Sequence, residues 1–187
     1  MFITPMILKP RKKSVEMLVL GIDAGKHLGL AVVHRDASGR LSCRHAQAVE
    51  VRNPWSVDWC DAVTRPIYDS RAIWQDMRQM GAVVEVPKGT YPGKASSSSL
   101  TRALIEASVV GMVLAKHFEL EDDAIITAAQ VRRMFCGSPT ANDAQVKLAL
   151  HRMGITMPRG ADNNHTRDAA LAAVFYMRRL SKGTNIT

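Results

Sequence analysis

The sequence has few cysteines, few aromatic residues and no long apolar run. Its three cysteines are Cys43, Cys60 and Cys136. No C-x-x-C pair occurs, so we expect reduced structural thiols and neither a zinc site nor a redox centre. No apolar stretch reaches the length of a membrane span, and the N-terminus is apolar over residues 1–8 and basic only afterwards, the reverse of a secretory signal. We therefore expect a soluble, cytoplasmic protein with no membrane partner.

Length and composition favour a single globular domain. The chain has 187 residues, of which 47% are hydrophobic, and it contains no polar low-complexity tract and no internal repeat. We expect a basic arm at residues 1–16, one domain at residues 17–182 and a short tail at residues 183–187. The arm carries a cluster of lysine and arginine that could lie along phosphates or form an ordinary solvated end.

Positive charge is in excess. Lys and Arg number 25 against 17 Asp and Glu, which gives a formal net charge of +8 and a pI of about 9.8. This balance suits a polyanionic partner such as nucleic acid, but it is also common in proteins that have none. The charge is therefore compatible with a nucleic-acid partner, but only the motifs can identify one.

The apolar pattern predicts a mixed α/β domain. Three antiparallel strands should open it, at residues 17–22, 28–33 and 43–51. A helix should then stop at Gly81, before an apolar run at residues 82–86 that is typical of a buried central strand. The later expected segments are a Gly-, Pro- and Ser-rich linker at 87–99, a long helix at 100–115, a short strand near 125–126, and helices at 127–134, 141–153 and 166–180. This order predicts helices covering a central sheet.

Two carboxylates stand out on the predicted strands: Asp23 at the end of the first strand and Glu85 within the apolar fourth strand. Each has an ordinary explanation. Asp23 is followed by Ala-Gly and could be a turn residue. Glu85 could face solvent or pair with an arginine, but without such a partner an ionised carboxylate in an apolar strand is costly.

His165 and Asp168 form a second polar pair, on the last predicted helix. They are three residues apart and so share one helix face with small alanines that permit a close approach to the sheet. The alternative is a helix start, capped by Asp162, Asn163 or Asn164, in which Asp168 only complements the helix dipole.

Together these side chains predict one site at one end of the sheet. Carboxylate oxygen suits Mg²⁺, and imidazole makes Mn²⁺ acceptable as well. Two such ions can activate a water, stabilise the leaving 3′ oxygen and orient a phosphodiester for in-line attack. The hypothesis is a site of two divalent cations held by Asp23, Glu85, His165 and Asp168.

Four segments resemble the RuvC family of Holliday-junction resolvases. The segment LVLGIDAGKHLGLAVV resembles the family's opening hairpin, VVEVPKG its Glu-bearing strand, ALIEASVVGMVLA its long helix, and NNHTRDAALAA its closing helix with His-x-x-Asp. The order and intervals match over most of residues 17–180. The resemblance implies an α/β, ribonuclease H-like fold, in which helices flank a mixed central sheet of three antiparallel strands followed by parallel strands.

The same resemblance implies a site and a partner. Carried over by position, the catalytic and metal-binding set would be Asp23, Glu85, His165 and Asp168. The family's homodimer would place two such sites on opposite strands of a four-way DNA junction. The small-residue helix at 100–115 is a candidate dimer face.

Two regions depart from the family's pattern. Where the family often has Gly-x-Gly-x-Ala-x-Lys, this chain has GSPTANDAQVK, with Asp143 near the expected lysine. In the loop after Glu85, Tyr91 could stack on an unpaired base or anchor the loop. The candidate DNA-binding residues are Lys88, Tyr91, Lys94, Arg132, Arg133 and Lys147. Any one of these basic residues could instead be ordinary solvated surface.

The sequence therefore predicts a homodimeric endonuclease that makes paired nicks in Holliday junctions or other branched DNA, with Mg²⁺ or Mn²⁺. Such a protein would be associated with the nucleoid, and a phage or mobile-element source is compatible with it. Two alternatives stay open: a protein that binds branched nucleic acid without cutting it, and an RNA nuclease of the same fold, as in the YqgF relatives. An actin-like or sugar-kinase ATPase is disfavoured, because it needs two such lobes.

Overall fold

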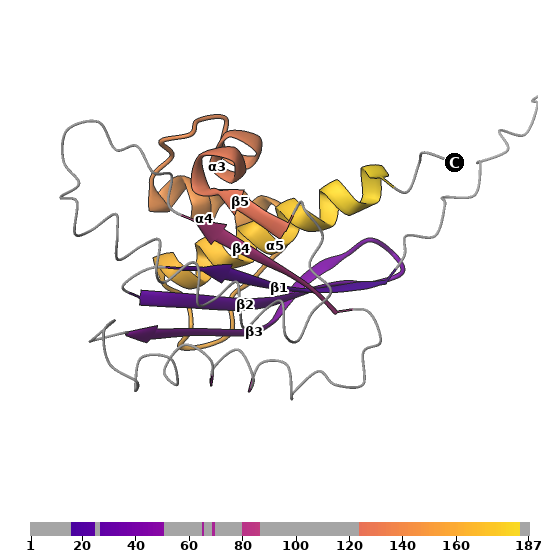
Figure 1. Cartoon of the computed structure of the whole chain (residues 1–187), viewed down its shortest axis with the longest axis horizontal. Helices are drawn as coiled ribbons and strands as arrows, with labels where there is room; N and C mark the ends of the chain where they lie inside the picture. The colour runs from indigo at the N-terminus through magenta and orange to yellow at the C-terminus, as the bar shows by residue number, and fades with distance from the viewer. Residues whose placement is uncertain are drawn as a thin grey trace, which may run out of the picture.

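The computed structural model describes residues 16–24, 27–50, 65, 69, 80–86 and 124–183. These residues form one sheet with helices packed against it (Figure 1). The strands are β1 (Met17–Asp23), β2 (His27–Arg35), β3 (Leu41–Glu50), β4 (Met80–Val86) and β5 (Ile125–Thr127). The helices are α3 (Ala128–Cys136), α4 (Asp143–Arg152) and α5 (Asn164–Gly183).

The sheet has five strands in the order β3-β2-β1-β4-β5. β1 pairs antiparallel with β2, and β2 pairs antiparallel with β3. β1 also pairs parallel with β4, which in turn pairs parallel with β5. This arrangement confirms the expected mixed sheet, in which three antiparallel strands precede parallel ones. Because β1 and β4 run in the same direction, their carboxyl ends lie at the same edge of the sheet.

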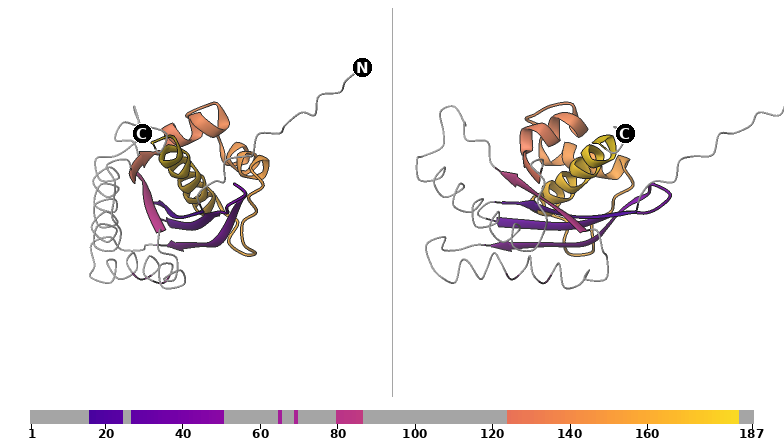
Figure 2. Two further views of the ribbon diagram at one scale, coloured as in Figure 1. Left: turned by 90° about the vertical axis from the view of Figure 1, so that its right-hand side faces the viewer. Right: turned by 45° about the vertical axis from the view of Figure 1, so that its right-hand side comes forward.

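The long helix α5 covers one face of this sheet, across β1, β2 and β4 (Figure 2). Its residues 169–177 are all buried, as is most of β1 and β2. Two strand glycines permit the close approach. A methyl group at Gly21 would overlap the Ala169 carbonyl, and one at Gly29 would overlap the His165 carbonyl. The start of α5 therefore packs directly against the hairpin formed by β1 and β2.

Each described helix begins at a polar cap. Thr127 and Gln130 form a capping box at α3, and Asn142 and Gln145 form another at α4. At α5, the Thr166 amide donates to Asn163 Oδ1 at 3.1 Å, and the Asn163 amide donates to Thr166 Oγ1 at 3.2 Å. Asn163, one of the three residues expected as a possible cap, therefore caps α5.

One expected boundary is wrong. Met80 and Gly81, which were expected to end a helix, belong to β4. A Cβ atom at Gly81 would lie 3.2 Å from the Tyr176 ring of α5, so the glycine makes room for an aromatic side chain. Of residues 51–79, the structure describes only Arg65 and Asp69, which are helical. The linker at 87–99, the helix at 100–115 and nearly all of the basic arm lie outside the described residues.

The structure describes two of the three cysteines, for which reduced structural thiols were expected. Cys43 and Cys136 are both free. Burial raises the pKa of the Cys43 thiol to about 12, so it is a poor nucleophile. Among the described helices, none combines the length and apolar character that crossing a membrane requires.

Candidate active site

The site is built where the first strand meets the last helix. Asp23 is the final residue of β1, and His165 lies in the first turn of α5. The His165 Nδ1 atom is 2.9 Å from the Asp23 Oδ2 atom. This hydrogen bond raises the pKa of His165, although partial burial of the ring acts in the opposite direction. The hydrogen bond to Asp23 therefore favours the protonated form of the imidazole.

Glu85 is the neighbour of Asp23 across the parallel β1–β4 pair. Only 6% of Glu85 is exposed. Burial raises its pKa well above the ordinary range, the charges of Asp23 and Asp168 raise it further, and the charge of Arg132 lowers it. Among the described side chains, Asp23, Asp168 and Arg132 act on the pKa of Glu85 through their charges and not through hydrogen bonds. The carboxylate is therefore buried beside like charges, which a cation would stabilise.

Asp168 lies one helical turn after His165 on α5 and is 9% exposed. Arg132 of α3 donates a hydrogen bond from its Nη2 atom to Asp168 Oδ2 at 2.7 Å. Burial nevertheless raises the pKa of Asp168, helped by the charge of Asp23 and opposed by Arg132. Three carboxylates from β1, β4 and α5 thus share one region, in which the charges of Asp23 and Asp168 raise the pKa of Glu85.

His27, at the start of β2, is a member of this region that sequence reasoning missed. Its ring is stacked against the ring of His165, with centroids 5.0 Å apart and an interplanar angle of 29°. The signal was its place just after the turn that follows Asp23, since a hairpin returns that position to the end of β1. The stacked His27 ring therefore restricts the orientation of His165.

The donor set fits a hard divalent cation by type, because it offers three carboxylates and an imidazole and no thiol. Their side chains are, however, engaged elsewhere: Asp23 with His165 and Asp168 with Arg132. Among the described residues, no three His, Cys, Asp or Glu side chains stand close enough together to hold an ion. An ion bound to Asp23 Oδ2 or Asp168 Oδ2 would compete with these contacts.

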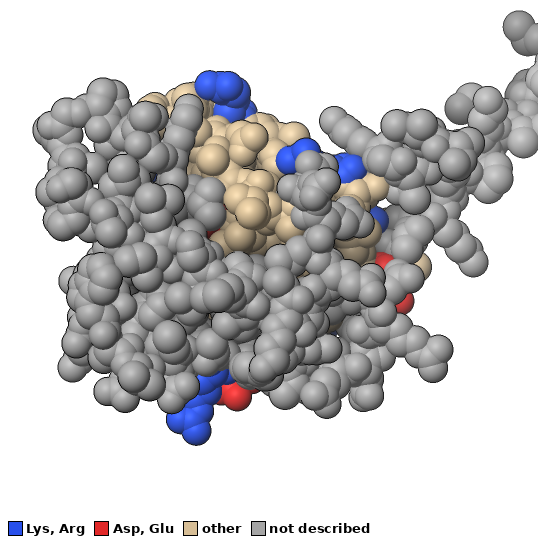
Figure 3. Space-filling view, viewed as in Figure 1, with Lys and Arg blue, Asp and Glu red and all other residues tan. Residues whose placement is uncertain are grey.

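The candidate DNA-binding residues fall into three groups. Arg132 points into the carboxylate region. Arg133, next to it on α3, is exposed, and Lys147 of α4 lies 3.3 Å from an oxygen of Asp162. Lys88, Tyr91 and Lys94 lie outside the described residues. On the face shown in Figure 3, the visible Lys and Arg atoms stand at separate points and form no single patch over the described surface.

Asp143, which stands near the family's expected lysine, has a structural role. Arg167 of α5 donates to both Asp143 oxygens, at 2.7 and 2.6 Å, and to Asp162 Oδ1 at 2.6 Å. Arg167 is 8% exposed. The two aspartates therefore satisfy a buried guanidinium and join the start of α4 to the start of α5. The presence of an aspartate at position 143 is therefore explained by its ion pair with Arg167.

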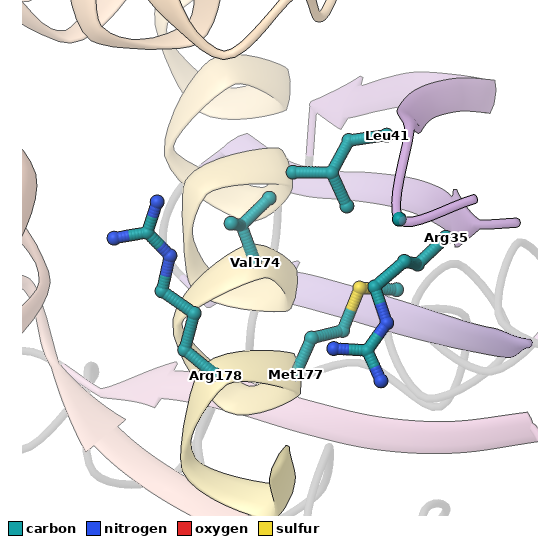
Figure 4. A pocket seen from close by; sticks show the side chains of 6 residues that line it. Arg35, Leu41, Val174, Met177 and Arg178 are labelled. Carbon is teal, nitrogen blue, oxygen red and sulfur yellow. The ribbon is translucent and has the colours of Figure 1, made fainter. Parts of the chain in front are cut away.

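A cavity of about 300 Å³ lies beside the second half of α5 (Figure 4). Its lining residues are Arg35, Gly39, Leu41, Val174, Met177 and Arg178. Val174 is six residues beyond Asp168, which is roughly two helical turns. The cavity is therefore separate from the carboxylates.

The chain resembles known proteins in structure, whereas its sequence matches none in the comparisons. No family model and no curated protein matches the chain. Among solved structures, RuvC of Thermus thermophilus is 22% identical with a TM-score of 0.66, and the alignment covers 90% of this chain and 98% of that one. The same bacterium's RuvC in complex with a Holliday junction substrate is 17% identical with a TM-score of 0.68, over 90% and 97% of the two chains.

A eukaryotic protein matches as well. The yeast mitochondrial Holliday junction resolvase Ydc2 is 13% identical with a TM-score of 0.61, over 91% of this chain and 81% of that one. At these identities the likeness concerns the fold. The chain has the RuvC-like, ribonuclease H-like fold that its sequence motifs predicted.

Proposed function

We propose that this protein is a metal-dependent endonuclease that cuts Holliday junctions or other branched DNA. The observation that carries the proposal is the convergence of Asp23, Glu85, Asp168 and His165 at one edge of a RuvC-like sheet. If each residue had only an ordinary role, such as a turn residue or part of a helix start, the four side chains would not be expected to lie together. Two of the three carboxylates, Glu85 and Asp168, are buried, and Asp23 is partly buried beside them. Charge repulsion among such groups destabilises a fold, so a site of this kind is expected to serve a function.

Asp23, Glu85 and Asp168 would hold divalent cations, with His165 as a further ligand or as the group that orients one. Mg²⁺ fits the carboxylate oxygens, and Mn²⁺ is acceptable to an imidazole. When bound in a pair, such ions supply an activated water and charge stabilisation for the leaving 3′ oxygen. The donor count is compatible with two ions per site.

The chain's own residues position these groups. Gly21 and Gly29 let α5 rest on β1 and β2, so that His165 and Asp168 reach the carboxyl ends of β1 and β4. The Asp23 carboxylate holds the His165 ring through Nδ1. The Nε2 atom on the other side of the ring lies 3.4 Å from the Asn164 Nδ2 atom. A metal ion at Nε2 would replace that contact and would need the imidazole in its neutral form.

The partner we propose is four-way or branched DNA bound by a homodimer. Two supports come from outside the site: the net charge of +8, and the likeness to a RuvC structure solved with a Holliday junction. A dimer would present two sites related by symmetry to the two strands that a paired cut requires. Arg133, Lys88, Tyr91 and Lys94 are the proposed contacts with DNA outside the metal site.

The test is cleavage of labelled four-way junction, linear duplex and RNA–DNA hybrid, with Mg²⁺, Mn²⁺ or EDTA. The proposal predicts symmetric nicks in the junction that require a metal and are absent from the linear duplex. Binding to the junction without cleavage in either metal would contradict it and favour a non-cutting protein. Cleavage confined to RNA-containing substrates would instead assign the protein to an RNA nuclease of the same fold.

A further inference from the structure

Arg132 is a cation that already occupies part of the acidic site. It lies on α3, in a different element from all four proposed ligands. Its Nη2 atom donates to Asp168 Oδ2 at 2.7 Å, and its Nη1 atom donates to the Ala141 carbonyl at 3.3 Å. The guanidinium therefore bridges the loop before α4 and the carboxylate on α5.

The bond geometry leaves this guanidinium incompletely satisfied. Its Nε atom is buried and, within the described part of the chain, has no hydrogen-bond partner. A buried donor without a partner costs free energy. By contrast, the nearby guanidinium of Arg167 is held by two carboxylates and a backbone carbonyl. Arg132 is thus the weaker anchor of the two, and its contact can be exchanged at lower cost.

The charge of Arg132 acts on the whole acidic group. It lowers the pKa of both Glu85 and Asp168, against the effect of burial. A divalent ion in the same place would act in the same direction with twice the charge. Arg132 therefore supplies, in part, the compensation that the carboxylates require before an ion binds.

A divalent ion bound to the same Asp168 oxygen would be repelled by the positive charge of Arg132. In the described geometry that oxygen is committed to Arg132, and no three donors are close enough for an ion. We propose that Arg132 is a displaceable counter-ion of Asp168, which holds this carboxylate in the metal-free protein and competes with the divalent cation for it. The proposal rests on the function proposed above and adds a positioning residue to the same site.

The test is direct metal binding, with no DNA and no turnover. Full-length wild type, Arg132→Gln, Arg132→Lys, Arg133→Gln and Asp168→Asn would be titrated with MnCl₂ by calorimetry, and their folding checked by circular dichroism. Removing the competing charged hydrogen bond should tighten Mn²⁺ binding roughly tenfold in Arg132→Gln. Arg132→Lys keeps the charge but not the fork geometry of the guanidinium, and it should tighten Mn²⁺ binding by about threefold. This variant provides the test if Arg132→Gln does not fold.

Arg133→Gln is the matched control, because it removes the same charge from the next residue of α3, which is exposed. Its Mn²⁺ affinity should stay within about twofold of wild type, since an exposed charge is screened. A purely structural role for Arg132 would lower thermal stability without tightening Mn²⁺ binding.

The outcomes separate the two proposals. If wild type binds Mn²⁺ through Asp168, and Arg132→Gln and Arg132→Lys bind it no more tightly, the competition is refuted and the nuclease site stands. An increase in Arg133→Gln as large as that in Arg132→Gln would also refute it, because long-range charge would then explain the effect. If no Mn²⁺ binding depends on Asp168, both proposals fail.

Discussion

The Nδ1 atom of His165 lies 2.9 Å from the Oδ2 atom of Asp23, across 142 residues of sequence. This bond joins the last helix of the domain to the end of its first strand. It occupies Nδ1, which leaves Nε2, 3.4 Å from the Asn164 Nδ2 atom, as the ring nitrogen that a ligand would use. The two residues therefore form one unit.

The first prediction concerns the titration of that unit in the absence of metal. Asp23→Asn removes the carboxylate whose hydrogen bond raises the pKa of His165, so the midpoint of the His165 titration should move to lower pH. NMR of the ring protons would measure it. The His45 ring on β3, whose pKa is lowered by burial, is the internal control and should titrate as in wild type. A His165 midpoint that stays or rises would show that Asp23 does not control the ring.

The second prediction is that Glu85→Gln stabilises the metal-free fold. Because burial and neighbouring charge raise the pKa of Glu85, its ionisation opposes folding once the pH exceeds the unfolded value of about 4.3. The cost grows as the pH rises through the higher folded pKa. Replacing the carboxylate by an amide should raise the free energy of unfolding by about 1 to 2 kcal/mol near neutral pH.

Urea unfolding in EDTA at about pH 8 and about pH 5 would measure this difference, which should be smaller at the lower pH. Glu50→Gln, an exposed carboxylate at the end of β3, is the matched control and should change stability little. A Glu85→Gln variant that is less stable than wild type at both pH values would mean that the carboxylate has a stabilising partner.

The third prediction tests the close contact between α5 and the sheet. The added methyl group of Gly21→Ala would overlap the Ala169 backbone, which cannot move without shifting the whole helix. We expect a loss of about 3 kcal/mol or more. Gly81→Ala is the comparison, because its methyl group would meet side chains and not backbone, the Tyr176 ring at 3.2 Å and Val19 Cγ2 at 3.7 Å. It should cost about 1 kcal/mol. Chemical denaturation of both variants measures this, and equal losses would refute the close contact.

The fourth prediction separates two cations that share Asp162. Arg167→Ala removes the buried guanidinium held by Asp143 and Asp162 and should lower stability by about 1 to 2 kcal/mol. Lys147, whose side chain is 61% exposed beside Asp162, should lose less than about 0.5 kcal/mol on replacement by alanine. Thermal unfolding would compare them. A larger loss for Lys147→Ala would contradict the assigned roles.

The strands and the proposed ligands could be predicted from sequence because their signals are local. An unbroken apolar run with one carboxylate marks β4 and Glu85, and His-x-x-Asp before a row of alanines marks the start of α5. Both signals depend on spacing along a single element. The parallel pairing of β1 with β4, which places Asp23 opposite Glu85, followed only from the family resemblance.

Other features depend on tertiary contacts that no local pattern contains. Gly81 was expected to stop a helix, but it lies in β4, where it pairs with Val19 of β1. The lack of a side chain at Gly81 makes room for the Tyr176 ring, which is distant in sequence. Arg132 was expected to contact phosphate as a surface residue, and its contact with Asp168 crosses from α3 to α5. His27 belongs to no motif, and its position in the hairpin did not by itself reveal the ring contact with His165.

The central claim is that the carboxylates of β1, β4 and α5 form one metal-dependent nuclease site. The most direct measurement is the single-turnover rate of nicking a labelled four-way junction in Mg²⁺ by wild type, Asp168→Asn and Asp162→Asn. The account predicts a loss of about 1000-fold or more in Asp168→Asn and a rate within about threefold of wild type in Asp162→Asn, since that residue contacts only surface and structural cations. Cleavage by Asp168→Asn at the wild-type rate would contradict it.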